Sequence, residues 1–186
     1  MTASPDDHAL PRGVASPPSG PVHVHFDGAC EEVGGQKVAA YGYTLDGPGL
    51  RHEDFGLAVP PGHPRATNNV AEYVGAICAL EWLSRQGFTG EVQLSGDSQL
   101  VLRQMTGEYR VLAEGLKPYH ERLEQLARSF RHVSFDWVPR EENVRADDLS
   151  KRGVALARRS RAPARSDGGT TSASRPPSDE ELTDDG

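Results

Sequence analysis

The chain has 186 residues, of which 25% are charged, and its 27 Asp and Glu against 20 Lys and Arg give a formal net charge of -7. This length is enough for one domain with a proper hydrophobic core. The acidic balance argues against generic binding of nucleic acid, because phosphate contacts to Lys and Arg normally supply most of that affinity. Any nucleic-acid function must therefore rest on a local site.

Both ends of the chain are too polar to belong to the core. Residues 1–20 show no apolar periodicity, and residues 158–186 are mostly Ser, Arg, Pro, Asp and Gly. Such segments cannot offset the entropy cost of ordering. We predict two disordered tails around a folded domain at 21–157. The basic run Arg158, Arg159, Arg161 and Arg165 and the acidic end SDEELTDDG are typical of a solvated tail.

Alternating apolar residues predict the first three elements. Val22, Val24 and Phe26 mark a first strand, and a Gly-rich turn at 34–35 follows it. Further alternations at 41–45 and 55–59 predict second and third strands, with turn residues at 46–49 between them. We expect these three strands to form an antiparallel meander.

The second half of the chain alternates helices with strands. Helical spacing of apolar residues predicts helices over about 69–85, 98–105, 116–130 and 143–156. Period-two patterns predict a fourth strand around 92–94 and a fifth at 133–137. Strands that alternate with helices after a meander indicate an α/β fold with a mixed sheet covered by helices.

The sequence gives no sign of a membrane segment or a zinc site. No stretch approaches the roughly 18 apolar residues of a membrane span, and the N-terminus lacks a basic region followed by an apolar run. Cys30 and Cys78 match no zinc or disulfide spacing, and Cys78 is interpreted as a core residue. His23 and His25 are interpreted as histidines of an exposed strand face. We predict a cytoplasmic monomer.

Four acidic residues stand in short polar segments: Asp27 in HFDGAC, Glu72 in TNNVAEY, Asp97 in LSGDSQLV and Asp147 in REENVRADD. Each has a local explanation. Asp-Gly is a common turn pair, Asn69 and Glu72 fit a helix capping box, and Asp97 and Asp147 stand where helix N-termini favour acids. Three of the four fall at element ends, and the strands that lead to Asp27 and Asp97 are expected to be neighbours. The acids can therefore converge.

Convergence of these carboxylates predicts a site for two divalent metal ions. Four carboxylates within a few ångströms repel one another and shift their pKa values rather than stay ionised together. Cations remove that difficulty, and Mg²⁺ and Mn²⁺ prefer oxygen ligands. Two such ions, roughly 3.5–4 Å apart, stabilise the attacking and leaving oxygens of an in-line phosphoryl displacement.

The words FDGAC, TNNVAEY and GDSQLV and the N-x-x-A-D of residues 143–147 match type 1 ribonuclease H, in the family's order and near its spacings. Residues 21–155 resemble that family. The resemblance implies a five-stranded mixed sheet, an antiparallel meander plus two parallel strands, with helices on both sides. It also implies a two-metal endonuclease, using Mg²⁺ or Mn²⁺, that hydrolyses the RNA strand of RNA–DNA hybrids to 5′-phosphate and 3′-hydroxyl ends.

The resemblance assigns roles to individual residues. Asp27, Glu72, Asp97 and Asp147 match the catalytic, metal-binding acids, with Asp27 as the ligand shared by both ions. Backbone groups near Gly28 and Ala29 would lie close to the RNA 2′-hydroxyls, which distinguish RNA from DNA. The side chains predicted to contact the hybrid are Asn69, Gln99 and Asn143.

The chain departs from the family pattern in two places. Many members carry a histidine-bearing loop between the fifth strand and the last acidic helix, whereas this interval is VPREEN, in which Arg140, Glu141 and Glu142 are available as substitutes. After Met105 the chain passes through TGEYRVLA to the next helix, without the basic protrusion with which some bacterial members grip the hybrid. Both departures resemble the compact archaeal-like branch, and we expect weak substrate affinity.

Two other functions fit parts of the sequence. The first is a non-catalytic module that binds RNA–DNA hybrid or structured RNA, which agrees with the acidic surface but not with the retention of all four acids. The second is the same metal chemistry on another substrate, such as a DNA junction, against which the words TNNVAEY and GDSQLV argue.

Overall fold

The first strand of the chain lies at the centre of the sheet. A computed structural model describes residues 20–161. The strands are β1 (Val22–Val33), β2 (Gln36–Gly47), β3 (Leu50–Leu57), β4 (Glu91–Gly96) and β5 (His132–Trp137). The helices are α1 (Asn68–Arg85), α2 (Gln99–Met105), α3 (Lys117–Ala127) and α4 (Val144–Arg161), and a short 3-10 helix, η1 (Arg140–Glu142), precedes α4.

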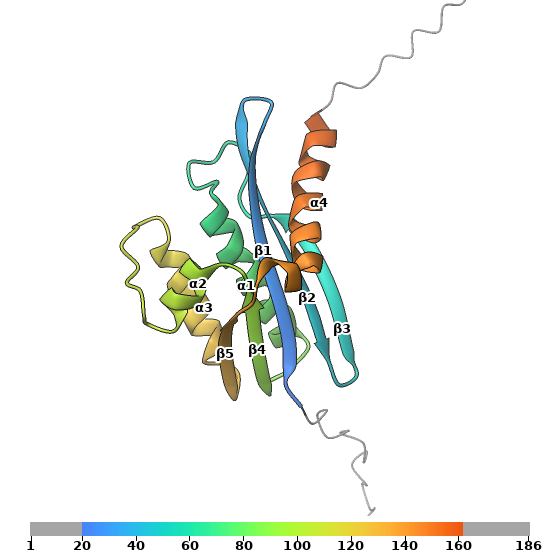
Figure 1. Ribbon diagram of the computed structural model, residues 1–186, viewed down its shortest axis with the longest axis vertical. Coiled ribbons are helices and arrows are strands. Elements are labelled where there is room, and N and C mark those ends of the chain that lie inside the picture. Colours follow the sequence, from blue (N-terminus) through green and yellow to red (C-terminus); the bar gives the residue numbers. More distant parts are fainter. Residues whose placement is uncertain (1–19, 162–186) are drawn as a thin grey trace, which may run out of the picture.

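The strand order β3-β2-β1-β4-β5 confirms the predicted fold class. β1, β2 and β3 form an antiparallel meander, and β4 and β5 continue the sheet parallel to β1. α1 packs on β1 and β2 and also contacts α2 and α3, whereas α4 packs on β1, β2 and β3 from the other face (Figure 1). Helices therefore cover both faces of the sheet.

The alternation in β1 divides its side chains between these two faces. Val22, Val24 and Phe26 are buried and join the main core with Tyr73 and Leu80 of α1. Residues between them point to the other face of the sheet, because successive side chains of a strand alternate. Asp27 thus belongs to the face that α4 covers.

Helix α1 has well-defined ends. The side chain of Thr67 accepts a hydrogen bond from the backbone N–H of Val70 at 3.2 Å. At the other end Gly87 has a φ of 73°, and the N–H of Phe88 donates to the carbonyl of Leu83. Glycine is favoured in this left-handed conformation because it has no Cβ. These caps fix which residues of α1 face the sheet.

Several predicted boundaries were wrong, including the end of the third helix, which lies at Ala127 and not at 130. β3 begins at Leu50 and ends at Leu57, so the predicted strand at 55–59 started too late. The early part of this edge strand carries exposed Arg51, Glu53 and Asp54, and so shows no apolar alternation. Helix α4 continues to Arg161, beyond the predicted domain end at 157, and Arg158 forms an ion pair with Glu31 of β1.

Cys30 and Cys78 are free thiols, and partly buried Cys78 packs against the core. No helix within residues 20–161 has both the length and the apolar character needed to cross a membrane. The rest of the predicted tails, at 1–19 and 162–186, lies outside the described residues.

Candidate active site

The candidate site opens where β1 and β4 stop pairing. Their parallel pairing runs from Val22 with Val92 to His25 with Ser95. β1 then continues for several residues, and Asp27 lies just past the last pair, while Asp97 follows directly on the end of β4. The neighbouring strands β1 and β4 bring these two acids to one place, as the sequence predicted. Asp27 lies within β1, however, and not at the strand end that the sequence indicated.

Glu72 reaches the same place from helix α1. A Cβ atom at Gly28 would lie only 2.3 Å from the backbone N of Glu72, so the glycine of the Asp27-Gly28 pair lets the helix pack directly on β1. The capping box predicted for Asn69 and Glu72 is wrong, because Thr67 caps the helix. The Glu72 carboxylate instead accepts a hydrogen bond from Asn68, at 3.3 Å.

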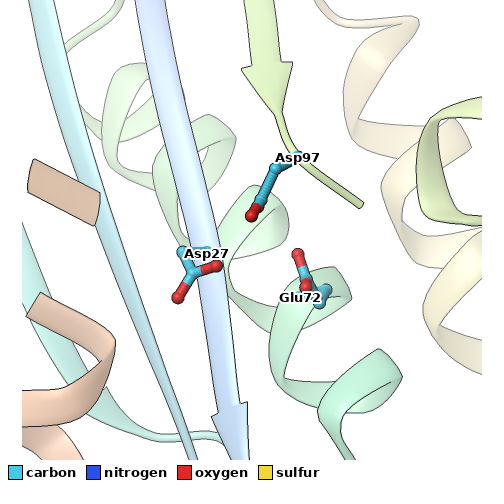
Figure 2. A group of neighbouring side chains, drawn as sticks. All are labelled: Asp27, Glu72 and Asp97. Atoms are coloured by element: carbon cyan, nitrogen blue, oxygen red, sulfur yellow. The ribbon is translucent and has the colours of Figure 1, made fainter. Parts of the chain in front are cut away.

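Asp27, Glu72 and Asp97, called here the acidic trio, offer ligand oxygens that all lie within 4.8 Å of one another. Figure 2 shows their carboxylates turned toward a common space. The Oε2 atom of Glu72 is buried and has no hydrogen-bond partner among the described residues. A buried carboxylate oxygen without a partner is costly. An oxygen-only set of this kind fits Mg²⁺ or Mn²⁺.

Burial and mutual repulsion raise the pKa values of two members of the trio. Desolvation raises the pKa of Asp27 to about 6, helped by the nearby charges of Asp97 and Asp147 and opposed by a hydrogen bond from Ser150. Desolvation also raises the pKa of Glu72 well above its usual range, and the charges of Asp27 and Asp97 add to the effect. Without a cation, these carboxylates do not readily ionise together.

The fourth predicted acid has a different environment. Asp147 stands in the first turn of α4, where it accepts hydrogen bonds from Arg140 at 2.9 Å and from Lys151 at 2.5 Å. Partial burial alone would raise the pKa of Asp147, but these two cations outweigh it and lower the pKa below its ordinary value. Asp147 lines the same cleft of about 240 Å³ as the acidic trio, without belonging to the trio itself.

Two buried polar side chains hold the carboxylates. The amide of Asn143 donates to the carbonyl of Phe26 at 2.9 Å and to Asp97 at 3.1 Å. We predicted that Asn143 contacts the hybrid, but the structure shows its amide engaged inside the protein. The hydroxyl of Ser150, which sequence reasoning missed, lies 2.5 Å from Asp27 Oδ2. A serine inside a helix gives no motif that could have revealed this contact.

The remaining predicted contacts divide into two groups. Gly28 and Ala29 line the cleft beside the acidic trio. Gln99 is exposed at the first position of α2, and Asn69 faces a neighbouring, largely apolar hollow with Leu100 and Tyr109. Both side chains therefore lie outside the lining of the acidic cleft, on the flank where α1 and α2 meet.

Known proteins are similar to this chain in sequence and fold. A family model described as reverse transcriptase-like matches residues 51–153, more than half of the chain. Ribonuclease HI of Halobacterium salinarum is 38% identical over 137 residues, which cover 73% of this chain and 65% of that protein. The crystal structure of RNase H1 from Halobacterium salinarum has a TM-score of 0.63 at 37% identity, over 74% of this chain and 99% of that chain. The chain belongs to the type 1 ribonuclease H family.

Two further ribonuclease H comparisons differ in coverage. The bifunctional protein Rv2228c of Mycobacterium tuberculosis is 40% identical over 98 residues, which span 53% of this chain but only 27% of that protein. LC11-RNase H1, solved in complex with RNA/DNA hybrid, is 31% identical with a TM-score of 0.63, over 73% of this chain and 98% of that chain. The whole ribonuclease H domain, rather than one motif, carries the similarity.

Both predicted departures from other ribonuclease H sequences have a structural counterpart. The 3-10 helix η1 occupies the interval in which many family members carry a histidine loop, and its Arg140 bonds to Asp147. Residues 106–116 connect α2 directly to α3, where some members have a basic protrusion. Two members of the VPREEN segment therefore bond to acids of the site: Arg140 to Asp147 and Asn143 to Asp97.

Proposed function

We propose that this protein is a metal-dependent endonuclease that hydrolyses the RNA strand of RNA–DNA hybrids and leaves 5′-phosphate and 3′-hydroxyl ends. The observation that carries the proposal is the acidic trio, because an oxygen-only cluster of converging carboxylates, two of them buried, calls for divalent cations. The name of the Halobacterium relative and the hybrid complex of LC11-RNase H1 support the choice of substrate.

Asp27, Glu72 and Asp97 would hold the metal, and Asp147 would complete the ligands of a second ion. Bound divalent ions supply an activated water and stabilise the attacking and leaving oxygens of an in-line displacement. The residues of the protein hold the metal-binding carboxylates in position. Asn143 holds Asp97, and Asn68 holds one oxygen of Glu72, so the carboxylates need little reorganisation when the ions enter.

Two exposed cations at the rim of the cleft are the proposed phosphate contacts. Arg140 and Lys151 both bond to Asp147, yet their side chains are 68% and 51% exposed. Arginine and lysine in such positions can bind phosphate oxygens from solvent. We assign to Arg140 the role of the missing histidine loop, because its guanidinium lies at the rim of the cleft and donates a hydrogen bond to Asp147. We assign contacts with the RNA 2′-hydroxyls to the backbone near Gly28 and Ala29, which lines the cleft.

Cleavage of an end-labelled RNA–DNA hybrid by the purified full chain tests the proposal. The reaction is run with Mg²⁺, with Mn²⁺ and with chelator, beside the variant Asp97→Asn and beside matched DNA and RNA duplexes. We expect metal-dependent cutting of the RNA strand of the hybrid, lost in the variant. Extension of the products by a polymerase identifies 3′-hydroxyl ends.

Two results would redirect the assignment. Intact hybrid with every metal, together with measurable hybrid binding by folded protein, would favour the non-catalytic module. Equal cutting of the DNA duplex would keep the metal chemistry and reject the substrate. Circular dichroism of Asp97→Asn confirms that a loss of activity does not come from unfolding.

A further inference from the structure

Ser150 lies in the second turn of α4 and is completely buried. Its hydroxyl oxygen is 2.5 Å from Asp27 Oδ2 and 2.9 Å from the backbone oxygen of Asp147. The close approach depends on Gly42 of β2, where a Cβ atom would lie 2.5 Å from the backbone N of Ser150. The glycine lets α4 lie directly on the sheet, and so the serine reaches the neighbouring strand.

The single proton of this hydroxyl has two possible acceptors. Serine within a helix commonly donates to a carbonyl of its own preceding turn, a local bond with little effect beyond the helix. Here the alternative acceptor is a carboxylate, and hydrogen bonds to ionised groups are roughly twice as strong as neutral ones. The bond to Asp27 therefore prevails when that carboxylate is ionised, which is the form that binds metal.

The two oxygens of Asp27 point in different directions. Figure 2 shows one turned toward Asp97 and Glu72, while the other points away from them, to the side of α4. The second oxygen, Oδ2, accepts the bond from Ser150. Fixing Oδ2 fixes the rotation of the whole carboxylate. The free oxygen is thereby aimed at the space that the acidic trio shares.

We propose that Ser150 is a positioning residue of the metal site, which orients Asp27 so that the metal-free protein already presents this ligand. The proposal rests on the proposed function, because it assigns the trio to metal. It also links the fourth acid to the trio, since the Ser150 hydroxyl lies 2.9 Å from the backbone oxygen of Asp147, in the preceding turn of α4. Groups that hydrogen-bond a metal ligand from outside typically change affinity by about 10- to 100-fold when removed.

Direct metal binding, measured without nucleic acid, tests this role. Titration calorimetry with Mn²⁺ compares the full-length wild type with Ser150→Ala and with Ser160→Ala. The control serine, Ser160, donates to the carbonyl of Leu156 at 3.1 Å in the same helix but contacts no carboxylate. We expect Ser150→Ala to bind Mn²⁺ at least about tenfold more weakly and Ser160→Ala to match the wild type.

A second readout separates positioning from a structural role. In hybrid cleavage, Ser150→Ala should need more Mn²⁺ for half-maximal rate and should recover most of its rate at saturating Mn²⁺. Mn²⁺ affinity of Ser150→Ala within twofold of the wild type overturns the proposal. A wild type that binds no Mn²⁺ removes both this inference and the proposed function, whereas a wild type that binds while both variants bind equally removes only the inference.

Ser150→Cys covers the case in which Ser150→Ala does not fold. A thiol is larger than the hydroxyl but occupies the same position on Cβ, and it is only a weak donor. Weaker Mn²⁺ binding by folded Ser150→Cys supports the positioning role, and unchanged binding rejects it.

Discussion

The acidic trio and Asp147 line one cleft, but their charges are balanced in different ways. Asp27 and Glu72 are buried, and their carboxylates accept hydrogen bonds from neutral groups: Asn68 donates to Glu72, and Ser150 and the backbone of Gly28 donate to Asp27. Asp147 is held between Arg140 and Lys151. The pKa values shift in opposite directions accordingly, upward for Asp27 and Glu72 and downward for Asp147.

This contrast separates two kinds of metal ligand. No cationic side chain bonds directly to the trio within the described residues, and Arg140 acts on it only from a distance, so an entering cation meets little competition for these carboxylates. Asp147 already has partners, and a metal must displace or share them. We therefore expect the trio to determine whether metal binds, and Asp147 with its two cations to adjust how the second ion and the substrate are held.

The largest expected effect is the loss of activity on neutralising the trio. Asp27→Asn or Glu72→Gln should lower the rate of hybrid cleavage by at least about a thousandfold, because bound metal supplies several kcal/mol of transition-state stabilisation. Single-turnover cleavage at saturating Mg²⁺ measures the change. Near-normal rates in either folded variant would contradict the role of the trio.

Neutralising the fourth acid should cost less. Asp147→Asn removes two charge-assisted bonds but leaves the trio intact, so we expect a fall of about 10- to 100-fold. The same single-turnover assay over a range of Mg²⁺ concentrations measures it. A loss as large as that of Asp27→Asn would erase the distinction between the two kinds of ligand.

Stability of the metal-free protein should respond to the two acids with opposite sign. The folded-state pKa of Asp27, about 6, is above its ordinary value of 3.8. Its contribution to stability is therefore present at low pH and lost as the pH rises through about 6. At pH 8 with chelator, Asp27→Asn should raise the free energy of unfolding by on the order of 2 kcal/mol. Urea unfolding measures this gain.

Asp147 supplies the matched comparison in the same experiment. Because the pKa of Asp147 is lowered in the folded state, its carboxylate stabilises the protein at pH values above the ordinary pKa of this group. This stabilisation is lost as the pH falls through the folded-state pKa. Asp147→Asn should therefore reduce stability at pH 8. Added Mg²⁺ should stabilise the wild type at pH 8 and have little effect at pH 5, where protons compete for Asp27. Equal behaviour of the two variants with chelator would refute the contrast.

The smallest expected effect concerns the rim. Lys151→Gln removes one partner of Asp147 and frees that carboxylate for metal. Exposed ion pairs contribute up to about 1 kcal/mol, so the Mn²⁺ concentration for half-maximal cleavage should fall by no more than about fivefold. An increase in that concentration would show that Lys151 supports the metal-bound form instead.

The fold class and the order of strands and helices could be predicted from the sequence, because both depend on which residues are buried in the core. Alternation in β1 and helical spacing in α1 follow from the core they share, and the convergence of Asp27 and Asp97 follows from the parallel pairing of β1 with β4. The start of β3 could not, since Arg51, Glu53 and Asp54 of that edge strand are exposed and carry no apolar pattern.

Contacts within the site depended on details that the sequence does not display. With 3.6 residues per turn, a shift of one residue turns a helix by about 100°. The cap at Thr67 is therefore decisive for which asparagine meets Glu72, and the structure shows Asn68 rather than Asn69. The role of Ser150 depends on how closely α4 approaches β2 at Gly42, a distance between elements far apart in the chain.

The central position of β1 has a consequence for the order of folding. On one side β1 pairs with β2 through a short turn, and on the other Val22 pairs with Val92 across a long stretch of chain. Local pairings close small loops and form quickly, whereas distant ones form late. Asp27 belongs to β1 and Asp97 follows β4, so the late pairing of these two strands brings the two acids together. The ability to bind a metal ion should therefore appear at the end of refolding. The time at which Mn²⁺ binding appears then reports when β1 pairs with β4.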